Sequence, residues 1–182
     1  MATFNVPTRE EVSESNQAIF DNLQKGLGFV PNLFATFAHS DTALGDYLTF
    51  QNRKSSLSAK EREVINLVVS QVNECAYCLA AHTALGKMNG FSDDQILEIR
   101  SGEASFDAKL DALAKFVKDI TINRSKPDQG TVDNFLAAGY TKENLVDAII
   151  VIGDKVVSNF LHGATQIPVD FPAAPALSEA AV

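Results

Sequence analysis

Residues 57–90, LSAKEREVINLVVSQVNECAYCLAAHTALGKMNG, decide the fold class of this chain. Ser58 and Glu61 have the spacing of a capping box, which marks the start of a helix, and an apolar run follows them. Asn73 is a good N-cap for a second helix, which ends near Gly90. The β-branched residues of the run would also suit a strand. The capping box and the lack of turn residues around the run favour two consecutive helices instead.

The rest of the chain carries similar helix signals. Apolar residues recur with the helical period, and capping residues or glycines punctuate the runs. Thr8 and Glu11 form a capping box, and Ser40 or Asp41 caps a later helix. Helices are predicted within residues 7–28, 29–40, 40–55, 91–102, 106–123 and 125–166, the last range being divided at Gly139 into a short and a long helix.

The expected fold is therefore all-α, a multi-helix bundle in a single domain over residues 1–182. No hairpin signal is present, and the tail over residues 167–182 is rich in proline and alanine, so it is expected to be extended. At 182 residues the chain is long enough for one domain with a substantial core.

Two segments of the chain resemble each other. AYCLAAHTA at 76–84 aligns with VVSNFLHGA at 156–164, and the alignment places His162 opposite His82. A degenerate internal duplication would explain the similarity. Chance similarity between two helices rich in alanine or valine explains it nearly as well.

Composition and charge limit the class of protein. Hydrophobic residues make up 46% and charged residues 21% of the chain, which is typical of a soluble globular protein. The formal net charge of -8 argues against nucleic acid or an anionic membrane as a partner. The most apolar run, LVDAIIVIGDKVV, is interrupted by Asp147, Asp154 and Lys155, so no membrane-spanning helix is expected.

The expected compartment bears on the two cysteines. The N-terminal residues MATFNVPTREEV lack the basic and apolar regions of a signal peptide, so a cytoplasmic protein is expected. Cysteines stay reduced there. A CxxC pair is then more typical of catalysis or metal binding than of a structural disulfide.

Both cysteines and one of the three histidines lie within two helical turns. At 100° per residue, Cys75, Cys78 and His82 fall within about 60° of one another on a helix. The i,i+3 spacing of the cysteines permits a disulfide. A thiol near a histidine and near a helix N-terminus ionises more easily. The spacing can therefore produce a thiolate, a resolving thiol and a proton carrier on one face.

Glu63 is an unusual residue for its apolar helix, where it forms a polar stripe with Asn66 and Ser70. One interpretation is a solvated face. The other is a carboxylate that faces inward and orients His82 beside the cysteines. The second requires the chain to turn at residues 73–74, because in one continuous helix Glu63 would lie about 18 Å from Cys75 along the axis.

Three interpretations of the CxxC pair compete. The cysteines could fill a core, or they could bind zinc with His82 and a fourth ligand, His162 or His39. The favoured interpretation is a dithiol redox site. For His39, a role at a helix C-terminus is favoured, and for His162 a hydrogen bond within the core.

The segment LSAKEREVINLVVSQVNECAYCLAAHTALGKMNGFS closely resembles the core of the carboxymuconolactone decarboxylase superfamily, in its AhpD-like alkylhydroperoxidase and peroxidase-related branch. The shared features are the leucine-serine start, the glutamate of ERE, the CxxCxxxH motif and the glycine that ends the helix. GFVPNLFATFAHS and GYTKENLVDAIIVIGDKVVSNF resemble the segments before and after this core in peroxidase-related members. The resemblance covers about residues 26–170.

The resemblance implies an AhpD-like helical fold that assembles as a homotrimer or hexamer, with no bound cofactor and no metal. By position it assigns catalytic roles to Glu63, Cys75, Cys78 and His82. Cys78, expected to be the sulfur nearest His82, would attack a hydroperoxide while His82, oriented by Glu63, takes the thiol proton. Cys75 would then close the disulfide. An external dithiol reductant protein, of the lipoyl type in this family, would reopen it.

Other functions stay open at this point. A dithiol oxidoreductase without peroxidase activity, a stress-linked binding protein of the same superfamily and a carboxymuconolactone decarboxylase-type enzyme are the alternatives. Decarboxylating members typically lack the cysteine pair, so the pair points away from that activity. The resemblance assigns no role to His39, Asn159 or His162.

Overall fold

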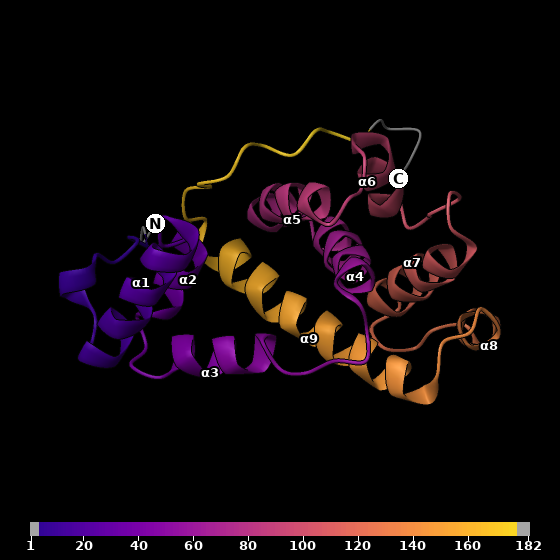
Figure 1. Cartoon of the computed structure of the whole chain (residues 1–182), viewed down its shortest axis with the longest axis horizontal. Helices are drawn as coiled ribbons and strands as arrows, with labels where there is room; N and C mark the ends of the chain where they lie inside the picture. Colours follow the sequence, from indigo (N-terminus) through magenta and orange to yellow (C-terminus); the bar gives the residue numbers. More distant parts are fainter. Residues whose placement is uncertain (1–3, 178–182) are drawn as a thin grey trace.

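Helices make up the regular structure of residues 4–177, the part of the chain that the computed structural model describes (Figure 1). No strand forms within this range, so the all-α prediction is confirmed. The elements are the 3-10 helix η1 (Arg9–Glu11) and the helices α1 (Glu14–Leu27), α2 (Asn32–Phe37), α3 (Ala43–Gln51), α4 (Ala59–Val72), α5 (Ala76–Met88), α6 (Asp93–Arg100), α7 (Ala108–Ile122), α8 (Gln129–Ala137) and α9 (Lys142–Thr165).

Two of the predicted helix starts are wrong. The capping box of Thr8 and Glu11 begins only the short helix η1, and extended backbone at Val12 separates it from α1. Helix α3 begins after Thr42, whose side chain makes no capping bond. Ser40 instead accepts a hydrogen bond from the amide of Ala43 through its hydroxyl. Both corrections concern a local backbone turn, which residue type alone specifies weakly.

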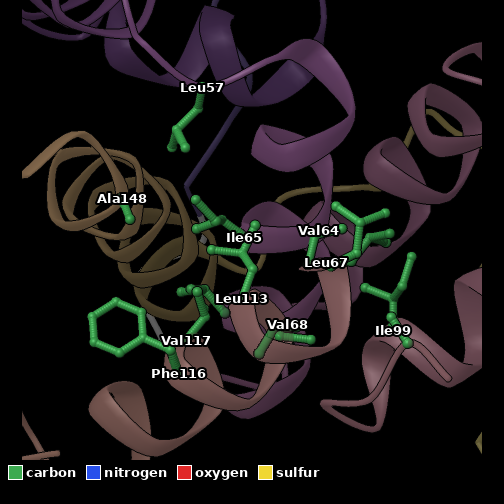
Figure 2. Close-up of a cluster of buried hydrophobic side chains, with 14 of the residues drawn as sticks. Leu57, Val64, Ile65, Leu67, Val68, Ile99, Leu113, Phe116, Val117 and Ala148 are labelled. Carbon is green, nitrogen blue, oxygen red and sulfur yellow. The ribbon is translucent and has the colours of Figure 1, made fainter. Parts of the chain in front are cut away.

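Helix α4 lies at the centre of the core. Most of its side chains are buried, because it packs against α5, α7 and α9 at once. In Figure 2, Ile65, Leu113 and Val117 gather beside Ala148 of α9, whereas Val64 lies on the side of α6. Because neighbouring helices cover α4 on several sides, its buried residues are not confined to one face, and the polar residues Glu63, Asn66 and Ser70 are buried with the apolar ones.

Helix α9 crosses the middle of the molecule and joins its two halves (Figure 1). Its first half belongs to the main core, and its last turns lie near α2. Helices α1, α2 and α3 enclose a smaller cluster of their own around Phe20 and Leu44. None of the helices within residues 4–177 is long and apolar enough to cross a lipid bilayer.

An extended segment, residues 166–177, follows α9, and we call it the C-terminal strap. It passes over α5 and reaches α6 (Figure 1). The carboxylate of Asp170 accepts a hydrogen bond from the amide of Asn32, at 2.7 Å, and Arg100 donates to the carbonyl of Pro175, at 2.6 Å. The expectation of an extended tail is confirmed for these residues, while 178–182 lie outside the described part of the chain.

Candidate active site

The turn between α4 and α5 places the two cysteines at a helix N-terminus. Asn73 ends α4, and Glu74 adopts left-handed backbone with φ 52°. Cys75, rather than the expected Asn73, is the N-cap of α5: its sulfur accepts a hydrogen bond from the amide of Cys78 at 3.3 Å. Cys78 therefore lies in the first turn, where the helix dipole favours a negative charge.

Near its C-terminal end, α9 forms hydrogen bonds with the turn between α4 and α5. The amide side chain of Asn159 accepts a hydrogen bond from Asn73 at 2.9 Å and donates to the hydroxyl of Ser70 at 3.4 Å. It also favours the thiolate forms of both cysteines by hydrogen bonding. Asn159, which sequence analysis left without a role, thus connects α9 to the turn that carries Cys75 and Cys78.

The two sulfurs have opposite acid–base character. The pKa of Cys78 is lowered to about 6, chiefly by the hydrogen bond from the Cys75 thiol and against the opposing effect of burial. The charge of Lys155, the hydrogen bond from Asn159 and the charge of His82 also contribute to this lowering. The pKa of Cys75 is raised, first by its hydrogen bond with Cys78 and then by burial. The site therefore has one sulfur that ionises near neutral pH and one that stays a thiol.

Glu63 and His82 form a buried pair between α4 and α5. Oε2 of Glu63 lies 2.9 Å from Nδ1 of His82, and Oε1 accepts a hydrogen bond from Asn66 at 2.9 Å. Glu63 is only 8% exposed, which contradicts the solvated-face interpretation and supports the inward-facing one. Burial would raise the pKa of Glu63, but the charge and hydrogen bond of His82 bring it below its usual range.

Nε2, the other ring nitrogen of His82, was expected to contact the sulfur of Cys78, but it contacts a different residue. Nε2 lies 3.2 Å from Nζ of Lys155, a residue of α9 that is 73 positions away in the sequence. Lys155 was not among the predicted site residues. The available signal was its position beside Asp154 inside an otherwise apolar helix, where a charged pair needs a buried partner.

Both thiols are covered. Cys75 and Cys78 are 3% and 2% exposed, and they pack with Leu33 of α2, Tyr77 of α5 and Ile167 of the C-terminal strap. The hydroxyl of Tyr77 accepts a hydrogen bond from the amide of Leu33 at 3.2 Å. Access to either sulfur from solvent therefore requires part of this cover to move.

The other two histidines make backbone contacts. Nε2 of His162 lies 3.3 Å from the carbonyl of Ile167, which is the core hydrogen bond expected for it. Nε2 of His39, just beyond the end of α2, lies 3.0 Å from the carbonyl of Asn5. Among residues 4–177, no group of three or more histidine, cysteine or acidic side chains is arranged to bind a metal ion.

The fold and the site together define a small all-α protein with a paired-thiol centre at a helix N-terminus. Residues 35–119 match the model of the Carboxymuconolactone decarboxylase family. The uncharacterized protein YdfG of Bacillus subtilis is 28% identical over 102 residues, which cover 55% of this chain and 69% of that protein.

Solved structures share the fold over nearly the whole chain. A peroxidase-related protein of Ralstonia eutropha JMP134 with an alkylhydroperoxidase AhpD core superposes with a TM-score of 0.82 at 20% identity, covering 92% of this chain and 91% of that one. A peroxidase-related protein of Silicibacter sp. TM1040 gives 0.79 at 23% identity, covering 91% and 90%. The debrominase Bmp8, in complex with 2,3,4-tribromopyrrole, gives 0.73 at 14% identity, covering 93% of each chain. These likenesses establish the AhpD-like fold.

Proposed function

We propose that this protein is a dithiol peroxidase that reduces organic hydroperoxides. The observation that carries the proposal is the pair of reduced cysteines at the N-terminus of α5, where Cys78 has a pKa of about 6 and Cys75 remains a thiol. A nucleophilic thiolate beside a resolving thiol is what a peroxidase of this type requires. The family and the AhpD-like fold are consistent with this chemistry.

In the proposed reaction, Cys78 is the nucleophile and Cys75 is the resolving thiol. The thiolate of Cys78 attacks the terminal oxygen of the hydroperoxide, the O–O bond breaks, and Cys78 becomes a sulfenic acid while the alkoxide leaves. A proton from water converts the alkoxide to the alcohol, which balances the proton that Cys78 releases when it ionises. The Cys75 thiol then condenses with the sulfenic acid, which forms the disulfide and releases water. An external dithiol, of the lipoyl type or another protein dithiol, restores both thiols by exchange.

Stopped-flow oxidation of the reduced protein by an alkyl hydroperoxide tests the proposal. We expect rapid loss of two thiols per chain, and peptide mapping that finds Cys75 and Cys78 joined within one chain. Cys78→Ser should abolish the rapid phase. Cys75→Ser should keep it but stop at a sulfenic acid, which a sulfenic-acid trapping reagent would report.

The alternatives predict different results. Slow and unselective thiol loss, with disulfides mainly between chains, would contradict the peroxidase and favour a binding protein. Fast disulfide exchange with a dithiol but no reaction with hydroperoxide would indicate a general oxidoreductase. Stoichiometric zinc in the purified protein would instead indicate a metal site. The proposed chemistry suits the cytoplasm, where external reductants keep thiols reduced.

A further inference from the structure

The starting observation is a buried lysine that the preceding mechanism does not require. Among the lysines and arginines of residues 4–177, two are buried, Arg100 and Lys155. Arg100 connects elements of the fold through hydrogen bonds to Gln71 and to the carbonyl of Pro175. Lys155 is only 3% exposed, and a lysine is seldom buried so deeply unless its charge has a partner.

Hydrogen-bonding capacity settles the direction of the contact with His82. A lysine nitrogen in its ammonium form has donors and no acceptor, so Nζ of Lys155 donates to Nε2 of His82. The carboxylate of Glu63 can only accept, so Nδ1 of His82 carries the hydrogen. Both ring nitrogens are then in use. With Nε2 occupied by the contact with Lys155, that nitrogen is not free to accept the Cys78 proton.

The Lys155 ammonium has one carboxylate partner, Asp154, and the cluster around it contains one further group that can carry a negative charge. Asp154 lies beside it on α9, with Oδ2 3.6 Å from Nζ, and Glu63 on α4 also feels its charge. Tyr47 of α3 lies against Asp154, and burial followed by that carboxylate raises the pKa of its phenol, so Tyr47 stays neutral. The remaining ionisable groups that face this cluster are on α5. They are Cys75, which stays a thiol, and Cys78, which ionises.

The causes of the low pKa of Cys78 are consistent with a Lys155 ammonium that faces this sulfur. After the hydrogen bond from Cys75, which is the largest stabilising effect, the charge of Lys155 is the next to lower the pKa of Cys78. It outweighs the charge of His82, which was the expected partner of the sulfur. An ammonium that a histidine fixes inside the protein interacts with a thiolate more strongly than it would in water.

We propose that Lys155 is the cationic partner of the Cys78 thiolate, and that Glu63 and His82 are positioning residues that hold the Lys155 ammonium in place. This inference deepens the proposed function, since it concerns how the same site ionises its reactive sulfur. In the sequence-based mechanism His82 acts directly on Cys78, whereas here Lys155 lies between them. Glu63 orients His82, His82 accepts a hydrogen bond from Lys155, and the Lys155 charge stabilises the Cys78 thiolate. Proton release from Cys78 to water is the only chemical step that it adds.

The test measures the ionisation of Cys78 without any hydroperoxide. In a Cys75→Ser background, which leaves one thiol and keeps a hydroxyl donor beside it, the rate of alkylation by iodoacetamide is followed from about pH 4 to about pH 9, a range that includes the reference thiol pKa. Thiolate ultraviolet absorbance gives an independent midpoint. The variants are Lys155→Gln, Lys155→Met and Lys155→Arg, with Lys142→Gln at the exposed start of α9 as the matched control.

Lys155→Gln can still donate a hydrogen bond to His82 and removes only the charge. We expect it to raise the midpoint of Cys78 ionisation by about one pH unit or more, as for the loss of an opposite charge at short range. Its alkylation rate near pH 6 should fall several-fold. Lys155→Arg should stay close to the background protein, and Lys142→Gln should be unchanged. Lys155→Met should match Lys155→Gln, which separates the charge from the hydrogen bond.

An unchanged midpoint in Lys155→Gln, with thermal unfolding like that of the background protein, would overturn the inference. A shift of equal size in Lys155→Arg would also overturn it, because the effect would then follow packing and not charge. The outcome is independent of the peroxidase proposal. If alkylation shifts as expected while hydroperoxide oxidises the wild-type thiols no faster than free cysteine, Lys155 keeps its role and the peroxidase proposal fails.

Discussion

The hydrogen bond between the two cysteines is the largest cause of the low pKa of Cys78, and it can be removed without touching the reactive sulfur. Cys75→Ala loses the donor, so we expect the pKa of Cys78 to rise and alkylation near pH 6 to slow. Cys75→Ser keeps an O–H donor and should stay near wild type. The pH profile of iodoacetamide alkylation checks this, and equal profiles for the two variants would show that the donor is unimportant.

Glu63→Gln removes the negative charge and leaves the hydrogen bonds intact, because the side-chain amide of Asn66 can turn to pair with the new side chain. Oδ1 of Asn66 has no hydrogen-bond partner, so a flip of the Asn66 amide would pair it with the new amide of residue 63. The hydrogen bond to His82 and the fold should survive. The imidazole would lose the carboxylate that polarises its Nε2 lone pair toward Lys155.

We therefore expect Glu63→Gln to raise the pKa of Cys78 and to slow its oxidation by hydroperoxide. General acid–base groups contribute about 10²–10⁴-fold, and the loss here should be smaller, since Cys78 is already largely ionised at neutral pH. His82→Ala should behave similarly, and the double variant should be little worse than His82→Ala alone because the two residues act in series. Stopped-flow rates across pH measure this. Additive losses would mean that Glu63 acts on the sulfur by another route.

At the scale of elements, Asp147 fastens the loop between α3 and α4 to α9. Its carboxylate accepts hydrogen bonds from the amide of Ser56 at 2.5 Å, from the hydroxyl of Ser56 at 2.7 Å and from Arg53 at 2.7 Å. The Ser56 amide is the main reason why the pKa of Asp147 lies well below its usual range, and burial opposes it. This attachment precedes α4 directly, so it helps to fix the helix that carries Glu63.

Asp147→Asn should destabilise the protein by roughly 1–3 kcal/mol at neutral pH, as expected for lost hydrogen bonds to a charged group. A carboxylate with a depressed folded-state pKa stabilises the protein above its unfolded pKa of about 3.9, and this contribution disappears as the pH falls through the folded-state pKa. The difference between wild type and variant in urea unfolding should therefore shrink in acid. Asp41→Asn on the surface is the control, and a difference independent of pH would contradict the assignment.

At the scale of the whole molecule, α9 presents an exposed apolar stripe. Val146, Ile149, Val157 and Phe160 all expose much of their side chains, at intervals that keep them on one side of the helix. Gly153 lies in the middle of the stripe. The family resemblance predicts a homotrimer or hexamer, and this stripe is where we expect one copy to contact another, since monomers rarely expose continuous apolar surface.

Val157→Glu combined with Phe160→Glu should therefore dissociate the assembly, because each buried carboxylate at the contact would be costly. Light scattering should change from a multiple of 19.6 kDa to a mass near 19.6 kDa. Met88→Glu replaces a strongly exposed apolar residue outside the stripe and should leave the mass unchanged. A wild-type mass near 19.6 kDa at micromolar concentration would contradict the predicted assembly.

The sequence alone determined the helices and the spacing of the thiols. Capping boxes, helix-ending glycines and the 3.6-residue period predicted nearly every element, because the hydrogen bonds of a helix join residues four positions apart. CxxCxxxH placed Cys75, Cys78 and His82 together for the same local reason. The turn at residues 73–74 was the one further assumption that brought Glu63 to His82, and the structure contains it.

Only the tertiary structure determined which side chains of α9 lie beside Cys75, Cys78 and His82. Asn159 and Lys155 belong to α9, more than 70 positions from the sulfurs and the imidazole that they act on. Their position depends on which face of α9 packs against α4 and α5, and no local pattern specifies that face. For this reason the partner of Nε2 of His82 could not be predicted. A polar residue inside an apolar helix signals a buried contact, but only packing between distant elements determines which atom it meets.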